Sequence, residues 1–170
     1  AAYSVFVVEE MAQVEQGVAS IASQLGSIDI LINNAGVGDF GSFEEMPVET
    51  WEKVMKVNLF GVYYVAKAAL PYLKQNKEGD IVNVASTAGL KGAPNMSAYC
   101  ASKAAVISLS QSLMAELRKF NIRVITLTPS TIATDMSIEG KLTDGNPEKV
   151  LQPEDFAEWV RDILKMNRRA

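Results

Sequence analysis

The sequence alternates short, almost continuously apolar runs with longer segments in which apolar residues recur every three or four positions. The short runs are rich in β-branched residues, which is typical of strands; they span residues 3–8, 28–32, 80–85 and 122–128. The longer segments show the spacing of amphipathic helices; they span residues 10–25, 50–73, 97–120 and 153–164.

Residues with turn and capping preferences mark the ends of the predicted helices. Gly26 is expected to end the first helix, because glycine accepts the left-handed conformation of a C-terminal cap. Thr50 is expected to cap the second helix, which Pro71 bends near its end. Residues 137–150 hold glycines, a proline and several charges, and they predict a loop that covers the site as a mobile lid.

Strands that are apolar on both faces and separated by helices predict a parallel sheet covered on both sides. The expected fold class is therefore a doubly wound α/β domain, and 170 residues suit one domain. Ligands of such folds bind beyond the carboxyl ends of the strands. The chemistry of this chain is accordingly expected just after its strands.

Composition removes several classes of function. The chain has no histidine, which excludes Ser-His-Asp hydrolysis and histidine-based zinc sites. The net charge of −4 and the lack of a basic stripe argue against nucleic acid. No apolar run reaches the length of a membrane span, so no membrane partner is expected. The single cysteine allows no internal disulfide, and a cytoplasmic location is expected.

Tyr99 and Lys103 are four residues apart near the start of a predicted helix, so their side chains share one face. An ammonium close to a phenol would lower the phenol's pKa and favour the phenolate. Such a tyrosine could give a proton to a carbonyl oxygen or take one from an alcohol.

The same spacing occurs at Tyr63 and Lys67, so spacing alone does not identify the site. Thr50 even precedes Tyr63 by the thirteen residues that separate Ser86 from Tyr99. Context distinguishes the two sets, because Ser86 follows a predicted strand whereas Thr50 begins a helix. We interpret Tyr63 and Lys67 as helix surface or a subunit contact.

Together, four motifs resemble the short-chain dehydrogenase/reductase family, in its order and near its usual spacing. They are the run 79–86 ending at Ser86, the run 99–103 with Tyr99 and Lys103, the run 33–36 and the run 57–59. The sequence of residues 128–136 is most similar to that of bacterial 3-oxoacyl-[acyl-carrier-protein] reductases.

The resemblance implies a catalytic role for four residues. Tyr99 would be the general acid/base, and Lys103 would lower its pKa and bind the nicotinamide ribose. Ser86 would orient the substrate oxygen, and Asn58 would hold a water that links Lys103 to solvent. The implied cofactor is NADP(H), with NAD(H) as the alternative; besides Tyr99 and Lys103, the residues implied to contact it are Asn34, Ala35, Gly36, Pro129, Ile132 and Thr134.

The resemblance also implies substrate and partners. The expected reaction is reduction of a carbonyl to an alcohol or its reverse, with a 3-oxoacyl thioester favoured and a sugar, steroid or other small carbonyl as the alternative. Members of this family commonly pair through two long helices, so a homodimer or homotetramer is expected through helices 50–73 and 97–120.

The chain departs from the family pattern at its front. No Gly-x-x-x-Gly-x-Gly turn, which would hold the cofactor's pyrophosphate, occurs in it. We therefore expect residues 1–170 to form a single partial Rossmann-type domain that lacks the family's first two strands and its last strand. Two interpretations follow: part of a longer enzyme, which we favour, or a non-catalytic remnant that serves subunit association.

Overall fold

The computed structural model describes residues 2–168. The chain divides into two compact units, Ala1–Thr128 and Pro129–Ala170. The single domain expected over residues 1–170 stays a prediction, and each unit is described by itself.

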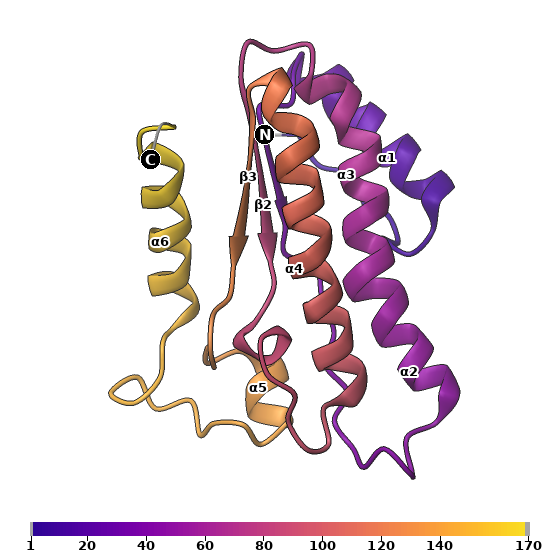
Figure 1. The fold of residues 1–170 in the computed structure, drawn as a ribbon, viewed down its shortest axis with the longest axis vertical. Coiled ribbons are helices and arrows are strands. Elements are labelled where there is room, and N and C mark those ends of the chain that lie inside the picture. Colours follow the sequence, from indigo (N-terminus) through magenta and orange to yellow (C-terminus); the bar gives the residue numbers. More distant parts are fainter. Residues whose placement is uncertain (1, 169–170) are drawn as a thin grey trace. The chain divides into compact units, whose positions relative to one another are not determined.

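The first unit consists of a parallel sheet and the helices that connect its strands (Figure 1). Its strands are β1 (Ile30–Asn33), β2 (Gly79–Val84) and β3 (Ile122–Leu127). Its α-helices are α1 (Met11–Leu25), α2 (Val48–Met55), α3 (Gly61–Leu73) and α4 (Ser97–Leu117). Three short helical turns complete it: a π-helical turn at Lys56–Phe60 and 3₁₀ turns at Thr87–Gly89 and Arg118–Phe120.

The sheet has the order β1-β2-β3 with both pairs parallel. Ile81 of β2 lies between Leu31 of β1 and Val124 of β3. This parallel sheet flanked by helices confirms the predicted α/β Rossmann-like class. Its three carboxyl ends meet at one edge, where the chemistry is expected.

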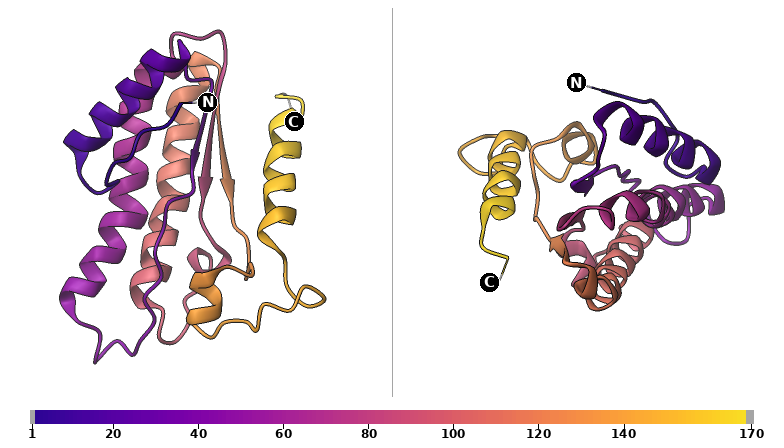
Figure 2. Two further views of the ribbon diagram at one scale, coloured as in Figure 1. Left: turned by 180° about the vertical axis from the view of Figure 1, so that it is seen from behind. Right: turned by 90° about the horizontal axis from the view of Figure 1, so that it is seen from above.

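One face of the sheet carries the main hydrophobic core. Helices α3 and α4 pack on that face, and α1 lies beside α3 (Figures 1 and 2). The core is buried because apolar side chains of all three helices meet those of β2 and β3; its members include Val14, Leu73, Ile81, Leu117 and Val124. On β1, Ile30 and Ile32 alternate with Leu31 and Asn33 and are 46% and 45% exposed.

The strand predicted at residues 3–8 is absent from the structure. The segment is irregular, and Tyr3 and Val5 are 84% and 90% exposed. A strand requires a neighbour for its backbone hydrogen bonds, and this segment runs along α1 instead. Phe6 lies directly on Gly17 of α1, where a Cβ would come within 2.2 Å of the ring. The absence of a side chain at Gly17 therefore allows this packing.

The helix predicted over residues 50–73 begins earlier and changes its winding midway. It starts at Val48 with Pro47 as its N-cap, so the prediction of a Thr50 cap is wrong. Proline is tolerated there because it has no N–H to donate, and the first N–H groups of a helix have no acceptor within the helix. Within the π-helical turn the N–H of Gly61 donates to the carbonyl of Lys56, five residues back. The helix then continues as α3 through Pro71.

The second unit contains α5 (Asp135–Glu139), α6 (Pro153–Lys165) and a parallel bridge between Ile132 and Leu151. The predicted loop 137–150 is partly helical, because α5 extends into it.

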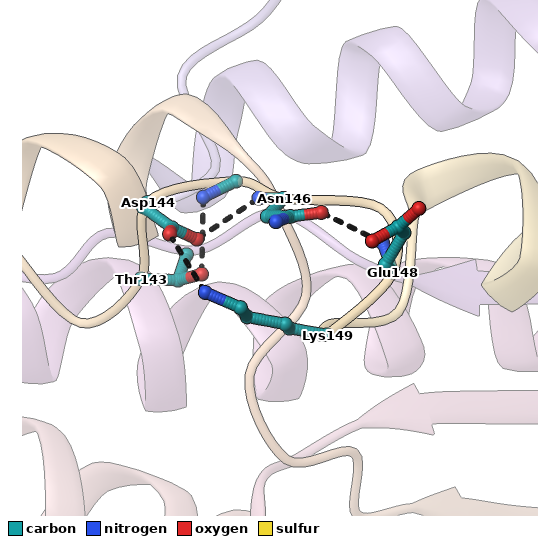
Figure 3. Close-up of polar contacts among 6 residues, drawn as sticks. Thr143, Asp144, Asn146, Glu148 and Lys149 are labelled. Atoms are coloured by element: carbon teal, nitrogen blue, oxygen red, sulfur yellow. Dashed lines mark hydrogen bonds and ion pairs between the residues drawn. The ribbon is translucent and has the colours of Figure 1, made fainter.

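The rest of that loop is held by its own side chains, as Figure 3 shows. The hydroxyl of Thr143, the carboxylate of Asp144 and the amide oxygen of Asn146 each accept a main-chain N–H two residues ahead, over 2.9–3.1 Å. The Nζ of Lys149 lies 3.7 Å from Oδ2 of Asp144, which makes an ion pair. These contacts give the loop an internal structure of its own.

Candidate active site

Ser86 lies two residues beyond β2 and is 8% exposed. It is the N-cap of the 3₁₀ turn Thr87–Gly89. Its hydroxyl oxygen accepts the N–H of Ala88 at 3.1 Å, and its carbonyl accepts the N–H of Gly89 at 3.0 Å. The tight turn therefore fixes the serine at the carboxyl edge of the sheet.

Tyr99 and Lys103 occupy the first two turns of α4, and their spacing places both side chains on one face of the helix. The Ser86 hydroxyl lies close enough to the Tyr99 phenol to lower its pKa. Lys103 is only 5% exposed, and its Nζ donates to the carbonyl of Val84 at 2.9 Å. The same Nζ lies 5.7 Å from the centre of the Tyr99 ring. The ring of Phe40 meets Tyr99 edge-on, with centroids 5.8 Å apart.

Burial dominates the electrostatics of this pair. It raises the pKa of Tyr99 above its ordinary value; the Ser86 hydrogen bond lowers that pKa in part, and the neighbouring Cys100 raises it. Burial lowers the pKa of Lys103 to about 8. Lys103 is not among the causes of the Tyr99 shift, so its expected lowering of the Tyr99 pKa stays a prediction. In the structure its Nζ donates to the carbonyl of Val84 and lies 5.7 Å from the centre of the ring.

Asn58 lies in the π-helical turn and is completely buried. Its Oδ1 accepts the N–H of Val37 at 2.8 Å, and its Nδ2 donates to the carbonyl of Val37 at 2.9 Å. The Nδ2 also donates to Ser102 Oγ at 3.1 Å, and that hydroxyl donates to the carbonyl of Tyr99 at 2.8 Å. Asn58 therefore joins the loop after β1 to the helix that carries Tyr99.

The segment after β1 approaches the site through Gly36. A Cβ at Gly36 would lie 3.3 Å from Asn58 Oδ1 and 3.6 Å from Lys103 Nζ, so glycine keeps this space free. Asn34 and Ala35 are exposed. Preceding them, the buried Asn33 donates from Nδ2 to Asn83 Oδ1 at 2.8 Å.

The structure thus brings Asn58, Ser86, Tyr99, Lys103 and Gly36 together in the first unit. Pro129, Ile132 and Thr134 belong to the second unit. There Thr134 caps α5 reciprocally with Ser137, and Ile132 forms the bridge to Leu151. Their contact with a cofactor stays a prediction.

The competing pair, Tyr63 and Lys67, lies on the exposed surface of α3. Lys67 Nζ donates to the Tyr63 hydroxyl at 3.2 Å, and Tyr63 is 43% exposed. The interpretation of this pair as helix surface is confirmed. Neither group is buried beside a strand end, so the pair lacks the surroundings of Tyr99.

Several residues of the site escaped sequence reasoning. Val37 acts through its backbone alone, and no sequence signal could have identified it. Phe40 contacts Tyr99 from a loop remote in sequence. Ser102 stands inside the 99–103 motif, and its small polar side chain in a helix was the available signal.

In the part of the chain that the structure describes, no helix combines the length and the apolar character needed to cross a membrane.

Comparisons with known proteins agree with this architecture. The family model described as short chain dehydrogenase matches residues 1–144. The chain is 42% identical over 142 residues to the "Inactive 2-(S)-hydroxypropyl-CoM dehydrogenase 2" of Xanthobacter autotrophicus, covering 83% of this chain and 62% of the relative. It is 38% identical over 137 residues to a 3-oxoacyl-[acyl-carrier-protein] reductase of Thermotoga maritima, covering 81% and 53%.

A solved structure extends the likeness to the fold. The alcohol dehydrogenase of Thermococcus sibiricus, complexed with 5-hydroxy-NADP, superposes with a TM-score of 0.87 at 28% identity, covering 97% of this chain and 68% of that one. The chain spans about half to two thirds of the length of the curated relatives cited. The family match over residues 1–144, with the site geometry described above, shows that the chain belongs to the short chain dehydrogenase family.

Proposed function

We propose that this protein is a nicotinamide-dependent oxidoreductase that interconverts a carbonyl and an alcohol, with Tyr99 as its general acid/base. The observation that carries the proposal is the buried cluster at the end of β2. There the Ser86 hydroxyl lies beside the Tyr99 phenol and lowers its pKa, and the Nζ of the buried Lys103 lies 5.7 Å from the centre of the ring.

The residues around Lys103 fit the ribose end of a nicotinamide cofactor. Among the described residues, the Lys103 ammonium has one hydrogen bond, to the carbonyl of Val84. An ammonium has three N–H donors, so two remain for ribose hydroxyls. Gly36 leaves open the space beside Nζ that a side chain would fill. When bound, the cofactor supplies or accepts the hydride.

The chain's own residues would handle the proton. A substrate carbonyl oxygen within reach of both hydroxyls would accept hydrogen bonds from Ser86 and Tyr99, which orient and polarise it. The raised pKa of Tyr99 keeps the phenol protonated at neutral pH, which suits the donor in carbonyl reduction. The Lys103 ammonium, with a pKa of about 8, is charged at pH 7 and favours the phenolate left behind.

Asn58 would hold the loop after β1 against α4, and it would link Lys103 to solvent through a water. Both N–H groups of its side chain are engaged, one by Val37 and one by Ser102. A water would therefore be held by an oxygen of Asn58.

For substrate and cofactor we favour a 3-oxoacyl thioester and NADPH. The sequence of residues 128–136 and the similarity to a 3-oxoacyl-[acyl-carrier-protein] reductase support this choice. Solved relatives include a gluconate 5-dehydrogenase in complex with NADP and an NAD⁺-bound xylitol dehydrogenase. A sugar or another small carbonyl with NADH is therefore the alternative.

A panel of 3-oxoacyl thioesters, sugars and simple ketones with NADPH and NADH tests the proposal. We expect NADPH oxidation that depends on the carbonyl compound and is fastest with the thioester. Preference for a sugar or for NADH would change the substrate assignment only. No turnover with any pair would contradict the proposed function and favour the remnant interpretation, in keeping with the name of one relative, which includes the word "Inactive".

We propose a cytoplasmic homodimer or homotetramer built through helices 50–73 and 97–120. Large apolar side chains exposed on these helices support the choice: Phe60 is 45% and Met114 is 51% exposed. Sedimentation equilibrium should give a multiple of the 18.5 kDa chain mass, and a monomer at micromolar concentration would contradict it.

A further inference from the structure

Gly89 lies directly against the main chain of α4. A Cβ at this position would be 2.7 Å from the carbonyl carbon of Lys103, and 2.8 Å from both Lys103 O and Ala104 N. Atoms of this kind do not approach so closely in folded proteins. All three neighbours are main-chain atoms inside a long helix, so they cannot rotate away as a side chain could.

The turn that contains Gly89 also holds Ser86. The Gly89 N–H donates to the Ser86 carbonyl at 3.0 Å, and the Ala88 N–H donates to the Ser86 hydroxyl at 3.1 Å. Ser86 and Gly89 therefore move as one short turn. That turn contacts α4 at Lys103, one helical turn beyond Tyr99.

We infer that Gly89 is a positioning residue for the reaction: its backbone contact with α4 sets the distance between the Ser86 hydroxyl and the Tyr99 phenol. The inference rests on the proposed function for its role in catalysis, although the contact itself can be tested without turnover. A side chain at residue 89 would force the turn outward and carry Ser86 away from Tyr99.

The surroundings allow such a movement without unfolding the unit. The residues that follow the turn, 90–95, are exposed, so the loop can shift outward. Gly92, three residues along the same loop, provides a matched control, because a Cβ there would meet nothing within 4 Å. Neither glycine has a positive φ, so alanine strains the backbone at neither position.

The ionisation of Tyr99 reports the position of Ser86. Besides burial, the polar groups that act on the phenol are Ser86, which lowers its pKa, and Cys100, which raises it; Lys103 lies 5.7 Å from the ring and Phe40 is uncharged. Withdrawal of the Ser86 hydroxyl removes the contribution that lowers the pKa. The pKa of Tyr99 should therefore rise when the turn is displaced.

The experiment titrates the free protein labelled with ¹³Cζ-tyrosine, followed by NMR, with the Tyr99 signal assigned from Tyr99→Phe. We expect Gly89→Ala and Ser86→Ala to raise the pKa of Tyr99 and Gly92→Ala to leave it unchanged. The double variant Ser86→Ala/Gly89→Ala should match Ser86→Ala, because the effect of Gly89 passes through Ser86. In turnover, Gly89→Ala should reduce kcat about tenfold, with KM nearly unchanged.

Three outcomes would overturn the inference: an unchanged Tyr99 titration in folded Gly89→Ala, additive effects in the double variant, or loss of folding in Gly89→Ala while Gly92→Ala folds. Loss of folding would mean that Gly89 is needed for folding and not for positioning Ser86. Melting curves of each variant show whether it folds. If the wild-type protein turned over no carbonyl compound, the proposed function would fail, whereas the titrations would still decide whether Gly89 positions Ser86.

Discussion

At the scale of single residues, burial has opposite consequences for the two ionisable groups of the site. It raises the pKa of Tyr99 and lowers that of Lys103, because in each case the charged form loses hydration. Both shifts favour the neutral forms, a protonated phenol and an uncharged amine. The Tyr99 phenol is therefore protonated at neutral pH, which agrees with the role of proton donor that we propose for it.

The lowered pKa of Lys103 predicts how stability changes with pH. In the unfolded chain a lysine has a pKa near 10.5, whereas in the folded protein Lys103 has a pKa of about 8. Between these values the unfolded chain binds more protons, so the free energy of unfolding rises with pH. Urea unfolding should show that the wild type gains about 1 kcal/mol over Lys103→Met between pH 8 and pH 9. An equal difference at both pH values would contradict this.

At the scale of elements, α4 connects the site to the rest of the first unit through two buried serines. Ser102 joins the helix to Asn58 of the π-helical turn, and Ser110 joins it to Asn83 of β2. Each hydroxyl also donates to a carbonyl one turn earlier in α4. The buried amides of both asparagines are thereby satisfied, which matters because an unpaired buried amide is costly.

The bond between Ser110 and Asn83 should contribute measurably to stability. Asn83 is completely buried, and Ser110→Ala leaves its Nδ2, which donates to Ser110 Oγ at 2.8 Å, without that acceptor. We expect Ser110→Ala to reduce the free energy of unfolding by about 1–3 kcal/mol. The matched control is Ser112→Ala on the same helix: Ser112 is exposed and donates only to the Ser108 carbonyl, so a change within about 0.5 kcal/mol is expected. Equal losses in the two variants would contradict the account.

Periodicity predicted the helices Met11–Leu25, Ser97–Leu117 and Pro153–Lys165 closely, because in each of them apolar residues recur at the three- and four-residue spacing of one helical face. It failed at residues 3–8, since a run rich in β-branched residues becomes a strand only beside another strand. The π-helical turn and the helix start at Val48 were not predicted from the sequence. Both depend on the backbone hydrogen bonds that form, and the residue types alone do not determine these bonds.

The candidate site was predictable in part. Ser86, Tyr99 and Lys103 were predicted to lie together because their motifs coincide with a strand end, and the structure brings them together. The direction of the Tyr99 pKa was not predictable, because it depends on how deeply the phenol is buried. The close approach of Gly89 to α4 also lies beyond sequence reasoning, since a glycine in a turn has no signature of what it touches.

At the scale of the whole molecule, burial is concentrated in the first unit. Every residue of β2 except Val84 is buried, whereas none of the residues of α6, all within the described chain, is buried. Trp159 of α6 is 56% exposed. Protection from local opening follows burial and packing, so the two units should differ in local stability.

Native-state hydrogen exchange measures that difference. We expect the amides of β2 and of the buried side of α4 to exchange only through global unfolding, and those of α6 to exchange at least about a hundredfold faster through local opening. Equal protection of α6 and β2 would show that α6 is covered in solution, for instance by another copy of the chain.

The central claim is that burial beside a strand end, and not the spacing of tyrosine and lysine, makes Tyr99 the acid/base. Tyr63 provides the matched control, because its hydroxyl accepts a lysine N–H at 3.2 Å with the same spacing on the exposed face of α3. The decisive measurement is kcat for carbonyl-dependent NADPH oxidation by Tyr99→Phe and Tyr63→Phe. Loss of at least about a hundredfold in Tyr99→Phe, with Tyr63→Phe within twofold of wild type, is the expected result. Normal turnover by Tyr99→Phe would contradict the account.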